Sequence, residues 1–256
     1  MNKTGKRRFL RLGLIVLFWL CVWQGASMAV DNSILLVGPA DVFGSLSAQM
    51  TEPDFWAAIL HSFARISLGF LLAFSAGVLL GSLAFALPLP GEILSPVILL
   101  LKSIPVASFV ILVLIWAGSG NLSVVIAFTV AFPMVYESTL SGLESADKKL
   151  LEMAQVFRIG LFRRARFIYF PALMPYLAAS CRTALGMSVK SGIAAEVIGI
   201  TSGSIGEALY NAKILFSTAE LLAWTVVIVL LSLAFERLFL WGLARVESVL
   251  LERSGT

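Results

Sequence analysis

The sequence predicts an all-α, polytopic membrane protein with about six transmembrane helices. Of its 256 residues, 59% are hydrophobic and 13% are charged, whereas soluble domains carry about 25% charged residues. Long uncharged segments recur along the chain, and a transmembrane helix needs about 20 predominantly apolar residues. Lysine and arginine gather in a few of the intervening segments, as expected where those segments stay in the cytoplasm.

The first expected helix follows a basic N-terminal segment. Residues 1–11 hold five lysines and arginines, and residues 12–30 are uncharged. A cleaved signal peptide is one alternative, because Ser27-Met28-Ala29 imitates a cleavage site. An apolar run of about 19 residues is long for a secretory core and suits a span, so we expect a retained helix. Residues 31–56 contain four acidic residues and no lysine or arginine, which indicates an extracytoplasmic loop.

Further spans follow from uncharged runs bounded by helix breakers. They are expected at residues 57–87, 93–116, 122–143, 171–199 and 216–243. In the first of these, a small residue recurs at every fourth position, which allows another helix to approach closely. These small residues are Gly69, Ala73, Gly77 and Gly81. In the second, Pro105 interrupts the helix close to Lys102, so a kink and a charge are expected together.

Residues 144–170 form the only long charged interval between apolar segments, with six basic and three acidic residues. Over the whole six-span arrangement, the proposed inside segments hold thirteen lysines and arginines and the proposed outside loops hold one, Lys213. This asymmetry predicts that both termini are cytoplasmic. It also explains the net charge of +4 without nucleic acid as a partner.

No catalytic constellation is evident. A Walker-type phosphate loop ends in Gly-Lys-Ser/Thr, and Gly5-Lys6 lacks both the spacing and the hydroxyl. One histidine, His61, and two cysteines, Cys21 and Cys181, give neither zinc-ligand spacing nor a disulfide framework. We therefore expect no enzyme activity and no metal or other cofactor bound by this chain.

The charged interval carries a motif. Glu152-Met153-Ala154, followed by Ile168 and Phe170-Pro171, resembles the EAA loop of ABC-importer permease subunits, with Pro171 at the family's distance from Glu152. Other matching stretches follow in the family's order: SFARISLGFLLA (62–73), LKSIP (101–105), WAG (116–118) and AAEVIG (194–199). Together they cover about residues 57–235 and resemble the nitrate, sulfonate and taurine branch of the binding-protein-dependent transport family.

Two positions depart from the family's motif. Met153 stands where the family has alanine, and Arg158 stands where it has glycine. If the backbone at residue 158 needs a positive φ, arginine costs stability there. Gly160, two residues later, is then the candidate for supplying the turn.

The resemblance implies a permease subunit in a bacterial plasma (inner) membrane, surrounded by lipid and working as a homodimer. It further implies ATPase subunits that bind ATP and magnesium, and an extracytoplasmic binding protein that delivers a small solute. The chain then divides into residues 1–56 (first helix and outer loop), a core permease domain (57–243, with coupling loop 144–170) and a cytoplasmic tail (244–256).

A cytoplasmic coupling helix is expected between the fourth and fifth spans. The pattern favours an amphipathic helix over residues 143–157, with one side formed by Leu143, Leu150, Ala154 and Phe157. The residues expected to couple to the ATPase are Glu152, Met153, Ala154, Phe157, Arg158 and Gly160. Contacts with lipid phosphates or with the ATPase are both open for Arg163, Arg164 and Arg166.

Ionisable residues inside spans are functional candidates, because a charge in lipid costs free energy. The candidate residues of the translocation path are Lys102, Pro105, Arg182, Lys190 and Glu196. Arg182 and Glu196 are about 21 Å apart along one helix, so we expect Glu196 to neutralise Lys190 or a charge on another helix. Structural pairing and solute contact are both open for these charges. For Arg65 and Glu137, snorkelling or pairing at an interface is the simpler explanation.

The three cations of this path favour small anions such as sulfonates, nitrate or bicarbonate. A neutral or heterocyclic solute, such as a thiamine precursor, is an alternative that the family resemblance also allows. A stand-alone secondary transporter or channel is the alternative of another class. It predicts paired half-helices in inverted repeats, which the sequence does not show.

Overall fold

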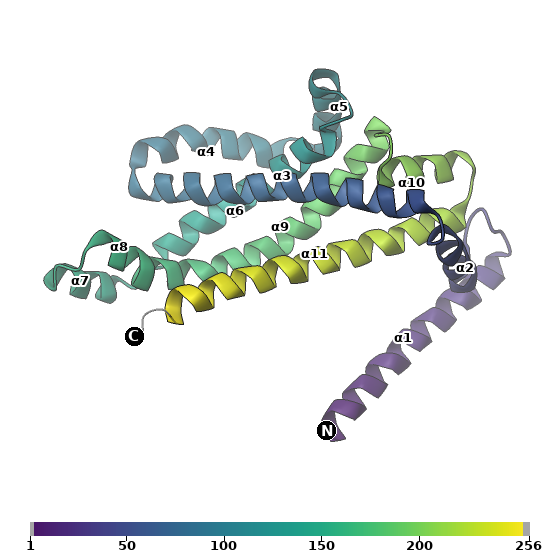
Figure 1. Ribbon diagram of the computed structural model, residues 1–256, viewed down its shortest axis with the longest axis horizontal. Helices are drawn as coiled ribbons and strands as arrows, with labels where there is room; N and C mark the ends of the chain where they lie inside the picture. The colour runs from purple at the N-terminus through teal and green to yellow at the C-terminus, as the bar shows by residue number, and fades with distance from the viewer. Residues whose placement is uncertain (1–2, 253–256) are drawn as a thin grey trace.

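The computed structural model describes residues 3–252, and over these residues the chain is helical with no strand (Figure 1). The predicted all-α class is confirmed. The helices are α1 (Lys3–Val30), α2 (Pro39–Gln49), α3 (Pro53–Ala86), α4 (Pro88–Ser103), α5 (Val106–Ala117), α6 (Leu122–Glu144), α7 (Lys148–Val156), α8 (Leu161–Arg164), the π-helix η1 (Ala165–Tyr169), α9 (Phe170–Gly199), α10 (Ile205–Ile214) and α11 (Thr218–Glu252).

Four of the described helices are long and apolar enough to cross a membrane. They are Gly13–Val30 of α1, α3, α6 and Thr218–Val249 of α11. The bent pair α4 and α5 makes a fifth if the two helices form one span. α9 has 30 residues, about 45 Å of helix, but its three charged residues keep it outside this apolar group. A multi-pass membrane protein is therefore supported, and the count of six spans stays a prediction.

The expected third span is broken more sharply than a kink. The axes of α4 and α5 differ by 106°, and Pro105 is the N-cap residue of α5. Proline lacks an N–H and disfavours the helical conformation in the residue before it, and Ile104 is indeed extended. In Figure 1, α4 runs alongside α3 whereas α5 turns away from it. α3 ends at Ala86, and α4 begins at Pro88, where the first helical turn tolerates proline.

The core of the bundle is α6, with α3 and α9 packed along it. The small residues of α3 make the close approach possible. A Cβ added to Gly77 would lie 2.8 Å from Val135 Cγ1, and one added to Gly81 would lie 2.9 Å from Thr139 Cβ. Since neither distance admits a side chain, the packing role predicted for the stripe is confirmed.

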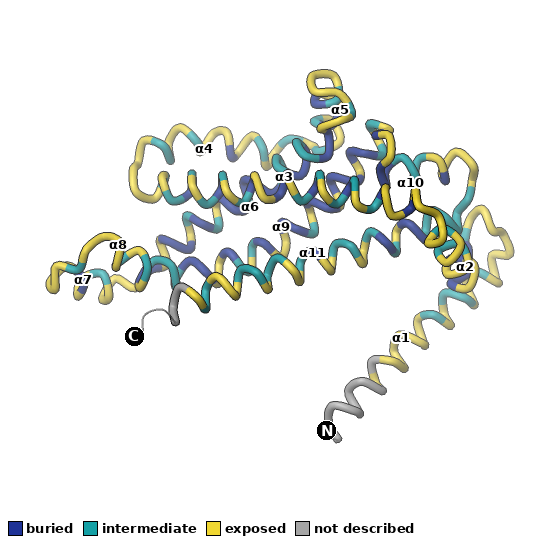
Figure 2. Tube along the Cα trace, in the orientation of Figure 1, coloured by how far each residue is buried: buried dark blue, intermediate teal, exposed yellow. Residues whose placement is uncertain are grey.

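α1 is the least packed of the apolar helices. No residue of its apolar segment Gly13–Val30 is buried, and Figure 2 shows it diverging from the bundle. Trp23 Nε1 donates to Val37 O at 3.0 Å and Ser27 Oγ donates to Leu36 O at 3.1 Å, which fixes its C-terminal end. An apolar helix exposed along its length suits contact with lipid.

Candidate coupling and translocation surfaces

The segment after α6 does not continue as one helix. Ser145, Ala146 and Asp147 interrupt it, and Asp147 caps α7 by accepting a hydrogen bond from Lys149 N at 2.8 Å. The single amphipathic helix expected over residues 143–157 is therefore wrong. Its expected common face is wrong too, because Leu143 is buried against α9 and Phe157 is 72% exposed.

α7 ends in a Schellman motif. Ile159 N donates to Ala154 O at 2.9 Å, and Arg158 N donates to Gln155 O at 3.0 Å. This pattern needs a left-handed residue at the position of Arg158, and its φ is +50°. The backbone of Arg158 thus has a conformation that glycine adopts most easily, and its side chain is exposed. Gly160 does not supply the turn, since its φ is −62°.

Arg164 holds the segment together in a way that the sequence did not suggest. Its Nε donates to Ile159 O at 2.8 Å and its Nη2 donates to Ala154 O at 3.1 Å. Ala154 itself is fully buried, in a small apolar cluster with Ala146 and Ile168. α7 is consequently anchored to η1, which leads without a break into α9.

Several large apolar side chains on this anchored segment are exposed. We define the α7–α8 patch as Met153, Val156, Phe157, Leu161 and Phe162; the last four are 72–83% exposed. Glu152 is exposed beside them. Contiguous exposed apolar surface marks an interaction site. Val156, Leu161 and Phe162 were not among the predicted coupling residues, although their apolar character inside a basic interval was a usable signal.

A polar groove lies between α6 and α9. It has a volume of about 370 Å³ and is lined by Met134, Glu137, Ser138, Ser141, Tyr176, Ser180 and Thr183. Lys102 Nζ lies 2.7 and 2.9 Å from the two carboxylate oxygens of Glu137, and both side chains are about half exposed. The predicted pairing of Glu137 is confirmed, and it joins α4 to α6.

The five predicted path residues are not brought into one site. Arg182 Nε lies 3.4 Å from Glu236 Oε1 of α11, a partner that the sequence analysis did not consider. Lys190 is exposed whereas Glu196 is fully buried, so neutralisation of Lys190 by Glu196 is wrong. Pro105 is exposed at the α4–α5 break.

Glu196 instead joins three helices. Ser62 Oγ of α3 donates to Glu196 Oε2 at 2.6 Å, and Gly206 N of α10 donates to the same oxygen at 3.4 Å. Ser62 Oγ also accepts from Ile205 N at 2.9 Å. α10 begins at Ile205, so its N-terminal end lies beside this side chain. The partners of Glu196 are thus a hydroxyl and a backbone N–H of other helices, and the expectation that it neutralises a charge on another helix stays a prediction.

The loop beside this carboxylate is strained. Ile200, which ends α9, has a φ of +46°, a conformation that is an outlier for a β-branched residue. Thr201 N donates to Glu196 O at 3.1 Å across it. Such strain persists only where surrounding contacts fix it, and the hydrogen bonds to Glu196 are such contacts.

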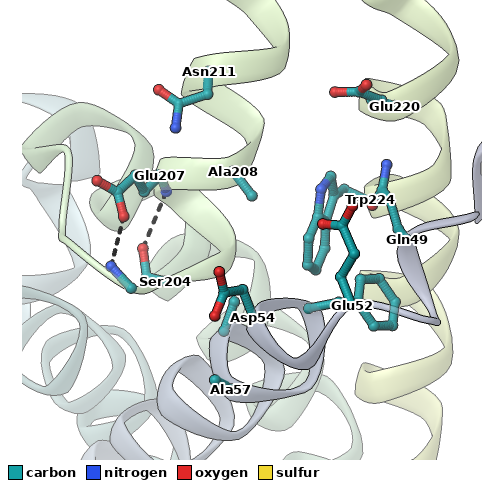
Figure 3. Close-up of a pocket in the computed structure, with 13 residues that line it drawn as sticks. Gln49, Glu52, Asp54, Ala57, Ser204, Glu207, Ala208, Asn211, Glu220 and Trp224 are labelled. Atoms are coloured by element: carbon teal, nitrogen blue, oxygen red, sulfur yellow. Dashed lines mark hydrogen bonds between the residues drawn. The ribbon is translucent and has the colours of Figure 1, made fainter.

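A larger cavity, of about 460 Å³, lies at the end of the bundle opposite α7 and α8 (Figures 1 and 3). Residues of α2, α3, α10 and α11 line it. Four of them are carboxylates: Glu52, Asp54, Glu207 and Glu220. No sequence motif marks this cavity, because its walls come from four separate helices.

Comparison with known proteins gives a consistent identification. Residues 69–247 match the family described as "Binding-protein-dependent transport system inner membrane component". The chain is 25% identical to the taurine transport system permease protein TauC of Escherichia coli, over 89% of this chain and 84% of TauC. It is 26% identical to the nitrate import permease protein NrtB of Synechococcus elongatus, over 87% of this chain and 84% of NrtB.

A third relative has a different named solute. The riboflavin transport system permease protein RibX of Chloroflexus aurantiacus is 26% identical, over 90% of this chain and 88% of RibX. The family match covers more than half of the chain, and these relatives are permease proteins rather than enzymes. The chain therefore belongs to the family of inner membrane components of binding-protein-dependent transport systems, as an ABC-type permease.

Proposed function

We propose that this chain is the transmembrane subunit of an ATP-driven importer and couples to ATPase subunits through the α7–α8 patch. In this proposal it works as a homodimer in a bacterial inner membrane, with both termini cytoplasmic, and it receives a small solute from an extracytoplasmic binding protein. The observation that carries the proposal is the exposed apolar patch on an anchored segment, within the basic interval of a chain of this family.

The patch suits docking into a groove of a cytoplasmic partner. A short amphipathic helix can place its apolar side chains in such a groove, and exposed aromatic residues are the usual anchors of an interface. Phe157 and Phe162 are therefore the expected anchors, with Glu152 beside them. The Schellman motif and Arg164 hold the segment in one shape, so that movement of the partner is transmitted through η1 to α9.

The polar groove supports a path between two copies of the chain. Ser180, Thr183 and Lys190 lie on a partly or fully exposed face of α9, and the pair of Lys102 and Glu137 lies beside it. Polar and ionisable groups at membrane depth face a bundle interior or water rather than lipid. We infer that this face of α9 meets the second copy across a hydrated path.

The proposed solute is a small anion. The exposed cations Arg182 and Lys190, and the solutes named for TauC and NrtB, support this choice. Arg182 and Lys102 are each paired with a carboxylate, which leaves less positive charge free than the sequence suggested. A heterocyclic solute is the second candidate, and the similarity to RibX favours it.

The test is ligand-stimulated ATP hydrolysis by the chain purified with a candidate ATPase and binding protein. The solute panel includes nitrate, taurine, bicarbonate, riboflavin and a thiamine precursor. We expect Phe157→Ser and Glu152→Ala to reduce stimulation roughly tenfold or more, as loss of an interface anchor does. Leu89→Ser is the matched control, because Leu89 is an exposed apolar residue in the first turn of α4, outside the α7–α8 patch, and it should retain stimulation.

Two results would contradict the proposal. One is failure of any ATPase to co-purify while solute uptake persists without ATP, which would support a stand-alone secondary transporter. The other is equal stimulation in Phe157→Ser, Glu152→Ala and wild type, which would remove coupling from the α7–α8 patch.

A further inference from the structure

Two features of the proposed path meet at the ion pair of Lys102 and Glu137. Lys102 is the penultimate residue of α4, directly before the 106° break between α4 and α5 (Figure 1). Glu137 lines the polar groove between α6 and α9. Broken helices and intramembrane charges are both typical of solute sites in transport proteins, because they are tolerated at membrane depth where they line a cavity. The pair is therefore a candidate solute contact, and its two charges limit the solutes that it can bind.

The pair is accessible and can open. The side chains of Lys102 and Glu137 are 49% and 47% exposed, and a lysine ammonium group sits on a flexible four-carbon stem. Lys102 also lies in the last turn of α4, where the helix dipole favours a positive charge. The lysine therefore has a second source of stabilisation when its bond to Glu137 is exchanged for a bond to a solute.

A solute with a single charge cannot replace this bond completely. An anion that binds Lys102 leaves Glu137 without a cation, and a cation that binds Glu137 leaves Lys102 without an anion. An unpaired charge costs more free energy in a site shielded from water than in bulk solvent. A solute that carries both an ammonium and an oxyanion group gives each side chain a new partner of opposite charge.

The remaining polar groups of the groove suit the oxyanion end of such a solute. Two serine hydroxyls donate to backbone carbonyls across α6 and α9, so their protons are already used. Over the described residues, the hydroxyl groups of Ser141, Tyr176 and Thr183 have no hydrogen-bond partner, and all three residues are exposed. A hydroxyl can donate to an oxygen of a sulfonate or carboxylate. The groove volume of about 370 Å³ suits a small solute.

We propose that the polar groove binds a small zwitterion, whose ammonium group pairs with Glu137 and whose oxyanion group pairs with Lys102 and the unused hydroxyls. This inference rests on the proposed function and narrows its solute class, because the anionic group is accompanied by an ammonium group a few bonds away. Glu137 is then a specificity-determining residue that disfavours anions of the same size without an ammonium group. Lys102 disfavours simple ammonium ions in the same way.

The experiment measures solute binding as protection of a cysteine in the groove of the complete permease–ATPase complex, without ATP or binding protein. Ser141→Cys reports occupancy through its rate of reaction with a maleimide, while Tyr176 and Thr183 keep their hydroxyls. Cys21→Ser removes the exposed native cysteine, and Cys181 is buried. Three probes share a two-carbon frame: taurine carries both charges, isethionate has a hydroxyl in place of the ammonium group, and ethanolamine has a hydroxyl in place of the sulfonate.

Taurine is expected to protect the cysteine at a concentration roughly tenfold lower than isethionate or ethanolamine. Glu137→Gln should shift the preference roughly tenfold toward isethionate, and Lys102→Met should shift it similarly toward ethanolamine, because each variant leaves one charge to be matched. The matched control is Glu144→Gln, since Glu144 is an exposed acid of the same helix as Glu137 and lies outside the groove lining. It should keep the preference for taurine.

Several outcomes would overturn the inference. They are equal protection by taurine and isethionate, equal protection by taurine and ethanolamine, no protection by any of the three, and an unchanged preference in Glu137→Gln. ATP hydrolysis stimulated by the binding protein is measured on the same complexes. Its absence in the wild-type complex would contradict the proposed function alone, since protection of the cysteine requires neither ATP nor binding protein.

Discussion

Replacing Ser62 by alanine is the sharpest test of how the outer ends of three helices are held together. Ser62 is fully buried on α3. Its hydroxyl donates to Glu196 Oε2 of α9 at 2.6 Å and accepts from Ile205 N of α10 at 2.9 Å. Ser62→Ala removes both bonds without adding volume, so it isolates the contribution of one oxygen atom.

The magnitude follows from the two groups left behind. An intramolecular hydrogen bond contributes about 0.5–1.5 kcal/mol, and a buried donor left without a partner costs about 1–3 kcal/mol. Glu196 keeps the longer bond from Gly206 N, and the chain can relax around the missing atom. We therefore expect Ser62→Ala to destabilise the protein by about 1–3 kcal/mol, which is the lower part of the sum of these two contributions.

The control lies on the same helix. Ser67 is also a serine of α3, and its Oγ is buried without a hydrogen-bond partner. Ser67→Ala should be neutral or slightly stabilising, because it removes a hydroxyl that gains nothing from burial. The assay is the rate of thermal inactivation of the purified protein in detergent, since membrane proteins often unfold irreversibly.

The inactivation rates of the two serine variants can also refute the role assigned to Ser62. Ser62→Ala should inactivate much faster than Ser67→Ala at one temperature, and Glu196→Gln, which keeps an acceptor for Ser62, should lie between them. Equal inactivation rates for the two serine variants would show that the contacts of Ser62 do not hold α10 to the bundle.

Three further predictions concern other sites. Arg158→Gly should raise stability by about 1 kcal/mol, because the φ of +50° strains any residue with a Cβ, whereas Arg158→Ala should not; thermal inactivation rates test this. Gly77→Ala should lower stability by about 1–3 kcal/mol through overpacking against α6, whereas Gly242→Ala of α11, with nothing within 4 Å, should be neutral in the same assay. Lys102→Met should lower transport by leaving Glu137 unpaired in the groove. Adding Glu137→Gln should restore it if the pair is structural, and uptake that stays low in the double variant would mark a solute contact.

The local features of the fold could be predicted from local sequence rules. Pro105 lies at the break between α4 and α5, where proline disfavours a continuous helix, and the spacing of Gly69, Gly77 and Gly81 places three small residues on one face. The left-handed conformation at residue 158 could be anticipated, because Arg158 stands where the family motif has a glycine. The start of α7 was missed, although Asp147 is a good N-cap residue and should have outweighed the apolar periodicity.

The long-range features could not be predicted in the same way. Ser62 and Glu196 are 134 residues apart, and one sequence contains no signal that pairs them. The pairing of Arg182 with Glu236 and the convergence of four carboxylates in the cavity opposite α7 and α8 are equally long-range. Each depends on which helices become neighbours, which side-chain periodicity within one helix does not determine.

The central claim is that this permease works only with an ATPase and a binding protein, and one measurement tests it directly. Uptake of a labelled solute is followed in proteoliposomes that contain the purified complex, with ATP inside or outside and with or without binding protein. Our account predicts uptake only when ATP is on the side of the α7–α8 patch and the binding protein is on the opposite side. Uptake that proceeds without ATP, or at the same rate without binding protein, would contradict it.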